Sequence, residues 1–135
     1  MKISSADELI ELGRQFGSKL RGGEVIELIG DIGVGKTTFA QGLALGLGIS
    51  GTVNSPSFTI MKSYQTPNGL TLNHYDFYRL DDAGIMKSEI TESINNDKAI
   101  TVVEWAKDVA GVLPTNRKII EIKYLTDSEG REVLL

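Results

Sequence analysis

Apolar residues recur along the chain at two spacings, one typical of helices and the other typical of strands. Helical spacing covers residues 5–20, where Ser5 and Glu8 also stand at the separation of a capping box. Two glycines, at 22 and 23, end this predicted helix. Its apolar face comprises Ala6, Leu9, Ile10, Gly13, Phe16 and Leu20. A second helix, ending near Gly48, is predicted from Phe39, Ala40, Leu43, Ala44 and Leu47.

Strand patterns account for much of the remaining chain. The predicted strands lie within residues 24–29, 52–64, 70–78, 99–103, 118–125 and 131–135. The second and third flank the turn sequence Pro67-Asn68-Gly69, which predicts an antiparallel hairpin. A short helix is expected around residues 88–94. No internal repeat or linker is visible, so we expect a single domain over residues 1–135.

The segment from Gly30 to Thr37 reads Gly-x-x-x-x-Gly-Lys-Thr, a complete phosphate-binding loop. Glycines let consecutive N–H groups turn inward around a phosphate, and the following helix directs its positive end at the same anion. Lys36 supplies a charge for the β- and γ-phosphates, and the Thr37 hydroxyl can bind Mg²⁺. The predicted nucleotide-binding set is Asp31, Ile32, Gly33, Val34, Gly35, Lys36, Thr37 and Thr38.

This loop lies between a predicted strand and a predicted helix, the context that supports a genuine phosphate loop over a chance Gly-rich turn. We therefore predict binding of a nucleoside triphosphate. The fold class predicted is α/β, a P-loop NTPase-like three-layer sandwich. Its mixed sheet would have parallel strands near the nucleotide and antiparallel strands elsewhere.

Composition narrows the function classes. The chain has 135 residues, 41% hydrophobic and 24% charged, with no signal-peptide pattern and no membrane-spanning run, so we expect a cytoplasmic protein without membrane contact. With no cysteine, and His74 as the only histidine, disulfides and multi-histidine metal centres are excluded. A net charge of −4 argues against a large nucleic-acid footprint, so a partner would carry most of any contact with RNA.

Two acidic residues are candidates to assist the metal and the reaction. Glu104 ends the most apolar predicted strand outside the loop, where P-loop enzymes place a carboxylate for Mg²⁺. The alternative is a strand-end carboxylate that faces water. Asp76 lies between aromatic residues, where acids are depleted, and it could orient the attacking water or bind the metal. An exposed position on an edge strand is the alternative for Asp76.

Other residues suit more than one role. Arg79 could neutralise phosphate charge or pair with a surface carboxylate, and Trp105 could pack in the core, stack beside the nucleotide or line a partner surface. A lone histidine such as His74 is more often structural than catalytic. Ser55, Ser57 and Thr59 follow the phosphate-loop helix, where nucleotide-driven switches place a mobile loop, although an ordinary turn would suit them equally well.

Four segments in this order resemble the TsaE (YjeE) family, small bacterial ATPases required to make threonylcarbamoyladenosine in tRNA. The matching segments are residues 30–38, 55–59 (Ser-Pro-Ser-Phe-Thr), 74–80 (His-Tyr-Asp-Phe-Tyr-Arg-Leu) and 103–105 (Val-Glu-Trp). Pairs at 113–114 and 130–131 also match, so the likeness covers nearly the whole chain.

The resemblance implies a Mg²⁺-dependent ATPase, weak alone, that acts with TsaB- and TsaD-type subunits of the transferase and reaches tRNA through them. Lys36 and Thr37 would hold phosphate and Mg²⁺, Glu104 would support the metal, and Asp76 would serve hydrolysis. Ser57 and Thr59 would belong to the switch segment.

The chain departs from the family pattern at three places. Ser57 stands where threonine is common, Ala106 stands where proline is common, and residues 82–96 lack the Leu-Gly pattern. These departures affect partner contacts more than nucleotide chemistry.

Two rival functions stay open at this point. A nucleotide-gated assembly subunit with little catalytic role would use the same loop. A small-molecule P-loop kinase would need a second pocket and usually an arginine-rich lid, for which 135 residues leave little room.

Overall fold

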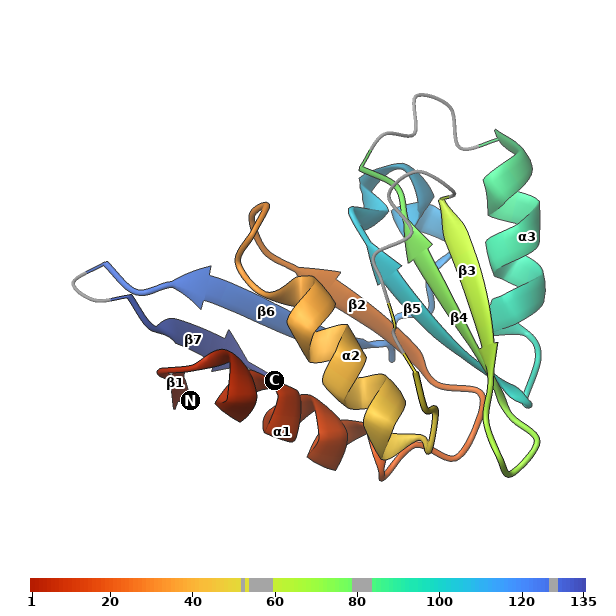
Figure 1. The fold of residues 1–135 in the computed structure, drawn as a ribbon. Coiled ribbons are helices and arrows are strands. Elements are labelled where there is room, and N and C mark those ends of the chain that lie inside the picture. The colour runs from red at the N-terminus through yellow and green to blue at the C-terminus, as the bar shows by residue number, and fades with distance from the viewer. Residues whose placement is uncertain (52, 54–59, 79–83, 127–128) are drawn as a thin grey trace. The chain divides into compact units, whose positions relative to one another are not determined.

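The computed structural model describes residues 1–51, 53, 60–78, 84–126 and 129–135 (Figure 1). Its elements in chain order are β1 (Lys2–Ile3), α1 (Ala6–Gly17), β2 (Val25–Ile29), α2 (Lys36–Gly46), β3 (Met61–Gln65), β4 (Thr71–Asp76), α3 (Gly84–Ile94), β5 (Ala99–Glu104), the 3₁₀ helix η1 (Ala106–Val112), β6 (Lys118–Tyr124) and β7 (Arg131–Leu134). The chain forms two compact units. Unit 1 comprises Met1–Leu20, Leu28–Asn54 and Ile119–Leu135, and unit 2 comprises Arg21–Glu27 and Ser55–Lys118.

Both units combine helices with strands, and the strand pairs include parallel and antiparallel ones, which confirms the predicted mixed α/β class. Strands follow the order β1-β7-β6-β2 in unit 1 and β2-β5-β4-β3 in unit 2, because β2 divides between the units after Glu27. In unit 2, β4 is parallel to β5 and antiparallel to β3. In unit 1, β7 is antiparallel to both β1 and β6.

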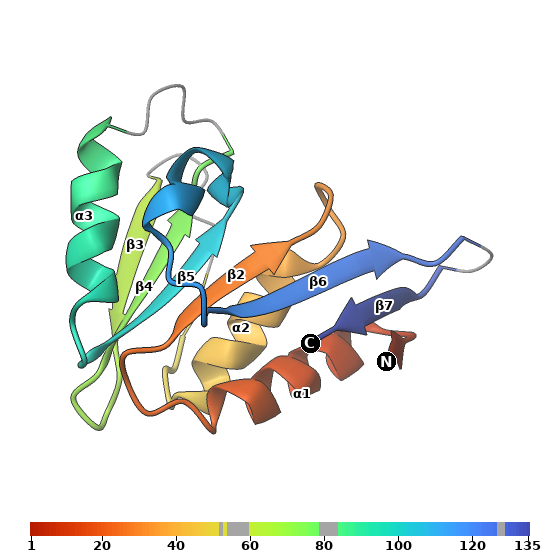
Figure 2. The ribbon, with the colours of Figure 1, turned by 180° about the vertical axis from the view of Figure 1, so that it is seen from behind.

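In unit 1, helices α1 and α2 lie side by side in both views (Figures 1 and 2). A Cβ atom at Gly13 would clash with the backbone of α2, and one at Gly42 would clash with the backbone of Ile10 in α1. The two backbones therefore touch directly, which fixes the helix that follows the phosphate loop. Ser5 caps α1 as predicted, but α1 ends at Gly17, three residues before the expected end.

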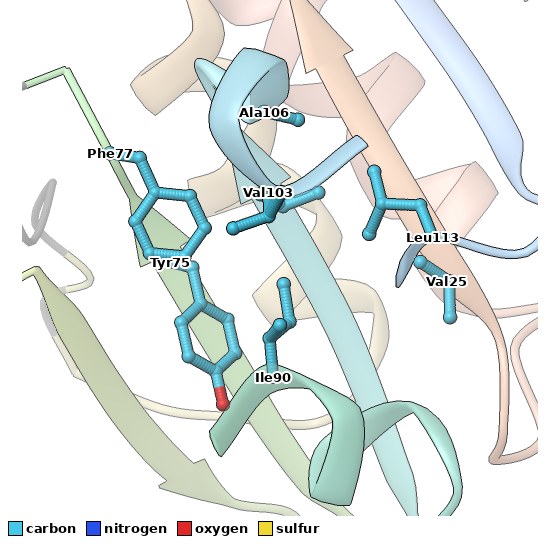
Figure 3. Close-up of a cluster of buried hydrophobic side chains, with 8 residues drawn as sticks. Val25, Tyr75, Phe77, Ile90, Val103, Ala106 and Leu113 are labelled. Carbon is cyan, nitrogen blue, oxygen red and sulfur yellow. The ribbon is translucent and has the colours of Figure 1, made fainter. Parts of the chain in front are cut away.

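In unit 2, helices α3 and η1 contribute to an apolar core with strands β4 and β5. Figure 3 shows the aromatic rings of Tyr75 and Phe77 beside Val103 and Ile90. The predicted hairpin is confirmed, since β3 and β4 pair antiparallel on either side of the Pro67-Asn68-Gly69 turn. Helix α3 is longer than the pattern indicated, because it begins at Gly84 within a polar stretch that lacks a clear apolar period.

The patterns did not predict β1 or η1. The two residues of β1 pair with β7, so this strand depends on a partner far along the sequence. Helix η1 follows Trp105, whose φ of 57° and ψ of 53° turn the chain sharply after β5. Ala106 begins η1 and is buried in the core of unit 2.

Candidate nucleotide-binding site

The phosphate loop lies between β2 and α2 in unit 1, so the strand–loop–helix context predicted from the sequence is confirmed. Gly33 and Gly35 have φ angles of 77° and 123°, in the region that favours glycine. Gly35 caps α2 without a side-chain hydrogen bond, so main-chain groups alone form the start of this helix. An anion at such a helix start is favoured by the N–H groups and by the helix dipole.

Lys36 is buried at the first position of α2. Its Nζ donates a hydrogen bond to the carbonyl of Gly30, and Nζ lies 3.5 Å from the carbonyl oxygen of Asp31. Burying an ammonium group is costly unless it is compensated, and these carbonyls provide compensation. The lysine ammonium group therefore lies against the phosphate loop, where the motif predicts that it contacts the phosphates.

A cavity of about 200 Å³ lies beside the loop, and the described residues that line it all belong to unit 1. Its lining includes Ile3, Ala6, Leu9, Gly33, Thr38 and Arg131. The cavity thus joins the first turn of α1, the phosphate loop and the start of β7. It offers apolar side chains next to main-chain donors, a combination that suits a nucleoside attached to phosphates.

The two candidate acids lie at the carboxyl ends of parallel strands in unit 2. Asp76 and Glu104 are the last residues of β4 and β5, and they are register partners. Both are buried, with 4% and 2% of their surface exposed, so the water-facing alternative for Glu104 is wrong. The edge-strand alternative for Asp76 is also wrong, because β4 lies between β3 and β5.

His74 has a partner that its sequence position did not reveal. Its Nε2 lies 2.6 Å from Oε2 of Glu104, and only 1% of its surface is exposed. The pair joins residues 30 positions apart, so only the parallel register of β4 and β5 brings them together. An acid at the end of the next strand was the only signal available in the sequence.

Trp105 packs against the core of unit 2, in agreement with the packing interpretation. Its ring also contacts the half-exposed Tyr78, with ring centroids 4.9 Å apart. Asp76 is tied to the same turn, because its Oδ1 accepts a hydrogen bond from the Tyr78 N–H at 3.0 Å. The remaining candidates, Arg79 and the predicted switch residues Ser55, Ser57 and Thr59, lie outside the described residues.

The oxygen donors at these positions suit Mg²⁺. Thr37 offers a hydroxyl and Glu104 a carboxylate, and Mg²⁺ prefers such hard ligands, usually one or two carboxylates together with substrate phosphates. Within the described ranges, no group of three or more His, Cys, Asp or Glu residues could hold a metal. Each of these two oxygen donors is of a kind that Mg²⁺ accepts beside substrate phosphates.

Comparison with known proteins decides the family. The family model described as "Threonylcarbamoyl adenosine biosynthesis protein TsaE" matches residues 3–133. The chain belongs to the TsaE family.

Relatives and a solved structure agree with this assignment. The protein named "tRNA threonylcarbamoyladenosine biosynthesis protein TsaE" of Bacillus subtilis is 42% identical, over 82% of this chain and 68% of that protein. The protein of the same name from Treponema pallidum is 36% identical, over 96% of this chain and 93% of that protein. The crystal structure of Bacillus subtilis YdiB matches with a TM-score of 0.78 and 33% identity, over 98% of this chain and 80% of that one. The resemblance seen in the sequence is thus confirmed.

Membrane contact was not expected for this chain. No α-helix in the part of the chain that the structure describes is long and apolar enough to span a bilayer.

Proposed function

We propose that this chain is an ATP-binding and ATP-hydrolysing subunit required for threonylcarbamoyladenosine modification of tRNA. One observation carries the nucleotide part of the proposal. It is a Gly-rich loop between a strand and a helix, with two glycines at positive φ and a buried lysine held against the loop. The relatives are named as tRNA threonylcarbamoyladenosine biosynthesis proteins, and these names support the proposed role in tRNA modification.

In this proposal, residues 31–38 bind the ATP phosphates through main-chain N–H groups and Lys36. The cavity beside the loop receives the nucleoside. Thr37 and Glu104 hold Mg²⁺, which neutralises charge on the phosphates when it is bound. Lys36 stabilises the negative charge that develops during the reaction, so it belongs to the catalytic set together with Asp76 and Glu104.

Asp76 would orient the water that attacks the γ-phosphate. The support for this role is that the Asp76 carboxylate is buried and its orientation is restrained by the hydrogen bond from the Tyr78 N–H. We expect weak hydrolysis by the isolated chain and faster hydrolysis with partners, and we propose Ser55, Ser57 and Thr59 as switch residues in this response. Arg79 and Trp105 stay candidates for contact with nucleotide or partner. A single ATPase domain over residues 1–135 also stays a prediction.

The proposed partners are the TsaB- and TsaD-type subunits of the threonylcarbamoyl transferase. A chain with a net charge of −4 has little electrostatic attraction for RNA, so tRNA would be held by the partners. Hydrolysis would then reset the transferase between turnovers. The proposed place of action is the cytoplasm.

The test is a reconstituted tRNA-modification assay with the transferase subunits, wild-type chain and the variants Lys36→Ala and Asp76→Ala. We expect both variants to lose multi-turnover modification, whereas the control Lys62→Ala on β3 keeps it. Full modification by both site variants would contradict the proposal. If Asp76→Ala stops phosphate release but modification continues, the chain is a nucleotide-gated assembly subunit instead. Phosphate transferred to a nucleoside or sugar, in place of free phosphate, would indicate a kinase.

A further inference from the structure

The β6–β7 hairpin contacts the phosphate loop through two side chains of unit 1. Tyr124 ends β6, Arg131 begins β7, and the two are register partners. The Tyr124 hydroxyl donates a hydrogen bond to the carbonyl of Ile32 at 3.1 Å. Arg131 Nε donates to the carbonyl of Val34 at 2.9 Å. The cross-strand pair of Tyr124 and Arg131 therefore hydrogen-bonds two carbonyls of the phosphate loop that lie two residues apart.

Each of these two contacts also orients the N–H group of the residue that follows the held carbonyl. In a trans peptide the C=O and the following N–H point in opposite directions, and no cis peptide occurs in the part of the chain that the structure describes. With the Ile32 carbonyl held by Tyr124, the N–H of Gly33 points away from that hydroxyl. With the Val34 carbonyl held by Arg131, the N–H of Gly35 points away from the guanidinium. Gly33 and Gly35 are the loop glycines at positive φ.

A loop of this kind needs such restraint from outside. Glycine has no Cβ to limit its backbone angles, so the loop sequence permits the binding conformation without enforcing it. Ordering a flexible loop on binding reduces affinity, whereas donors that are already oriented do not carry this cost. Contacts that fix the peptide planes before a ligand arrives would therefore strengthen phosphate binding without touching the ligand.

The arginine is itself firmly positioned. Its NH1 group donates to the carbonyls of Glu129 at 2.5 Å and Gly130 at 3.2 Å. Its guanidinium carbon lies 4.3 Å from the centroid of the Tyr124 ring, a distance at which cation–π attraction acts. Lysine has a single ammonium group and cannot reproduce this planar fork.

The tyrosine contact is not a requirement of burial. Tyr124 is 47% exposed, so its hydroxyl would be satisfied by water without a main-chain partner. Removing that hydroxyl should consequently affect the loop more than the stability of the fold.

We propose that Tyr124 and Arg131 are positioning residues that set the amides of Gly33 and Gly35 for a polyphosphate, an inference that rests on the proposed nucleotide binding. Tyr124 needs no contact with the nucleotide for this effect, whereas Arg131 also lines the cavity assigned to the nucleoside, so Tyr124→Phe isolates the action through the loop. Their action is transmitted through the carbonyls of Ile32 and Val34.

The test compares Tyr124→Phe and Arg131→Lys with the matched controls Tyr64→Phe on β3 and Arg14→Lys on α1. Isothermal titration with Mg²⁺ and a non-hydrolysable ATP analogue gives the Kd of each, and thermal unfolding without nucleotide gives its Tm. We expect the Kd to rise about fivefold for Tyr124→Phe and about tenfold for Arg131→Lys, in the range of one lost hydrogen bond. The controls should bind like the wild type, and Tyr124→Phe should keep the wild-type Tm.

The outcomes separate this inference from the proposed function. If the wild-type chain does not bind the analogue, with or without partner subunits, the proposed function and the inference both fail. If the wild type binds and Tyr124→Phe and Arg131→Lys bind equally tightly, only the inference fails. Should Arg131→Lys not fold, Tyr124→Phe decides alone.

A second readout follows the amides directly. In ¹H–¹⁵N spectra, nucleotide should shift the Gly33 and Gly35 resonances of the wild type. In Tyr124→Phe without nucleotide, the Gly33 amide should already differ from its wild-type position, whereas Tyr64→Phe should leave it unchanged. An unaltered Gly33 amide in Tyr124→Phe would overturn the inference.

Discussion

The phosphate loop of unit 1 and the strand-end acids of unit 2 are built on opposite principles. The loop presents main-chain groups, and Asp31, Ile32 and Gly33 are exposed. The strand ends present the side chains of His74, Asp76 and Glu104, which are buried. In the loop, the proposed function depends on backbone shape, and a change there should alter the stability of the fold only slightly. At the strand ends, the side chains proposed for the chemistry also bear on stability, because a buried polar group that loses its partner destabilises the fold.

The largest effect should follow from breaking the His74–Glu104 pair. His74→Leu leaves the Glu104 carboxylate buried without this partner, and we expect the free energy of unfolding to fall by about 3 kcal/mol. Urea denaturation followed by Trp105 fluorescence measures it. His74→Gln, whose amide can donate to Glu104, should recover part of the loss. If His74→Leu is as stable as the wild type, the strand ends do not combine stability with function.

The corresponding change in the loop should affect binding and spare stability. Lys36→Ala removes a charge that would contact two phosphates, and we expect the Kd for Mg²⁺–ATP to rise about 100-fold. Its unfolding free energy should change by less than that of His74→Leu, as measured by the same denaturation experiment. A large loss of stability together with a small change in Kd would reverse the comparison.

A glycine pair sharpens the claim that backbone shape matters in the loop. Gly35 and Gly51 both have positive φ, at 123° and 98°. A Cβ at Gly35 would lie 2.6 Å from Leu9 Cδ2, whereas one at Gly51 meets nothing within 4 Å. We expect Gly35→Ala and Gly51→Ala each to lose about 1 kcal/mol or more of stability through backbone strain. Only Gly35→Ala should weaken nucleotide binding, which calorimetry on both variants would check.

The smallest effect concerns a surface ion pair on α1, away from both regions. Arg14, with help from Gln15, lowers the pKa of Glu11 from 4.5 to about 2. The stabilisation from this pair is therefore present above pH 4.5 and is lost as the pH falls from there toward 2. Because both side chains are exposed, the effect on Tm should be slight. Glu11→Gln should remove this pH-dependent stabilisation. If thermal unfolding of Glu11→Gln over a pH series shows the same pH dependence of Tm as the wild type, the Glu11–Arg14 pair does not contribute.

The difference between the two regions also explains what the sequence could predict. The phosphate loop is local: eight consecutive residues carry its chemistry, and the flanking apolar runs identify its strand and helix. The β3–β4 hairpin was predictable for the same reason, because its turn sequence lies between its strands. Both predictions depend on neighbours in sequence.

Features that depend on distant residues were not predictable. His74 and Glu104 meet only through the register of two parallel strands, and no spacing rule fixes that register. Likewise, nothing near Tyr124 or Arg131 in sequence indicated that they hold the carbonyls of Ile32 and Val34. The 3₁₀ helix η1 was missed because it follows from the left-handed backbone of Trp105, a conformation that tryptophan rarely adopts.

Titration calorimetry of the wild-type chain with Mg²⁺ and a non-hydrolysable ATP analogue, repeated at two temperatures, measures directly whether the phosphate loop binds a nucleoside triphosphate. Two temperatures are needed because a binding enthalpy that vanishes at one of them will not vanish at the other. We predict one nucleotide bound per chain, with binding greatly weakened in Lys36→Ala. No heat of binding at either temperature, even with the transferase subunits present, would show that the chain does not bind a nucleoside triphosphate.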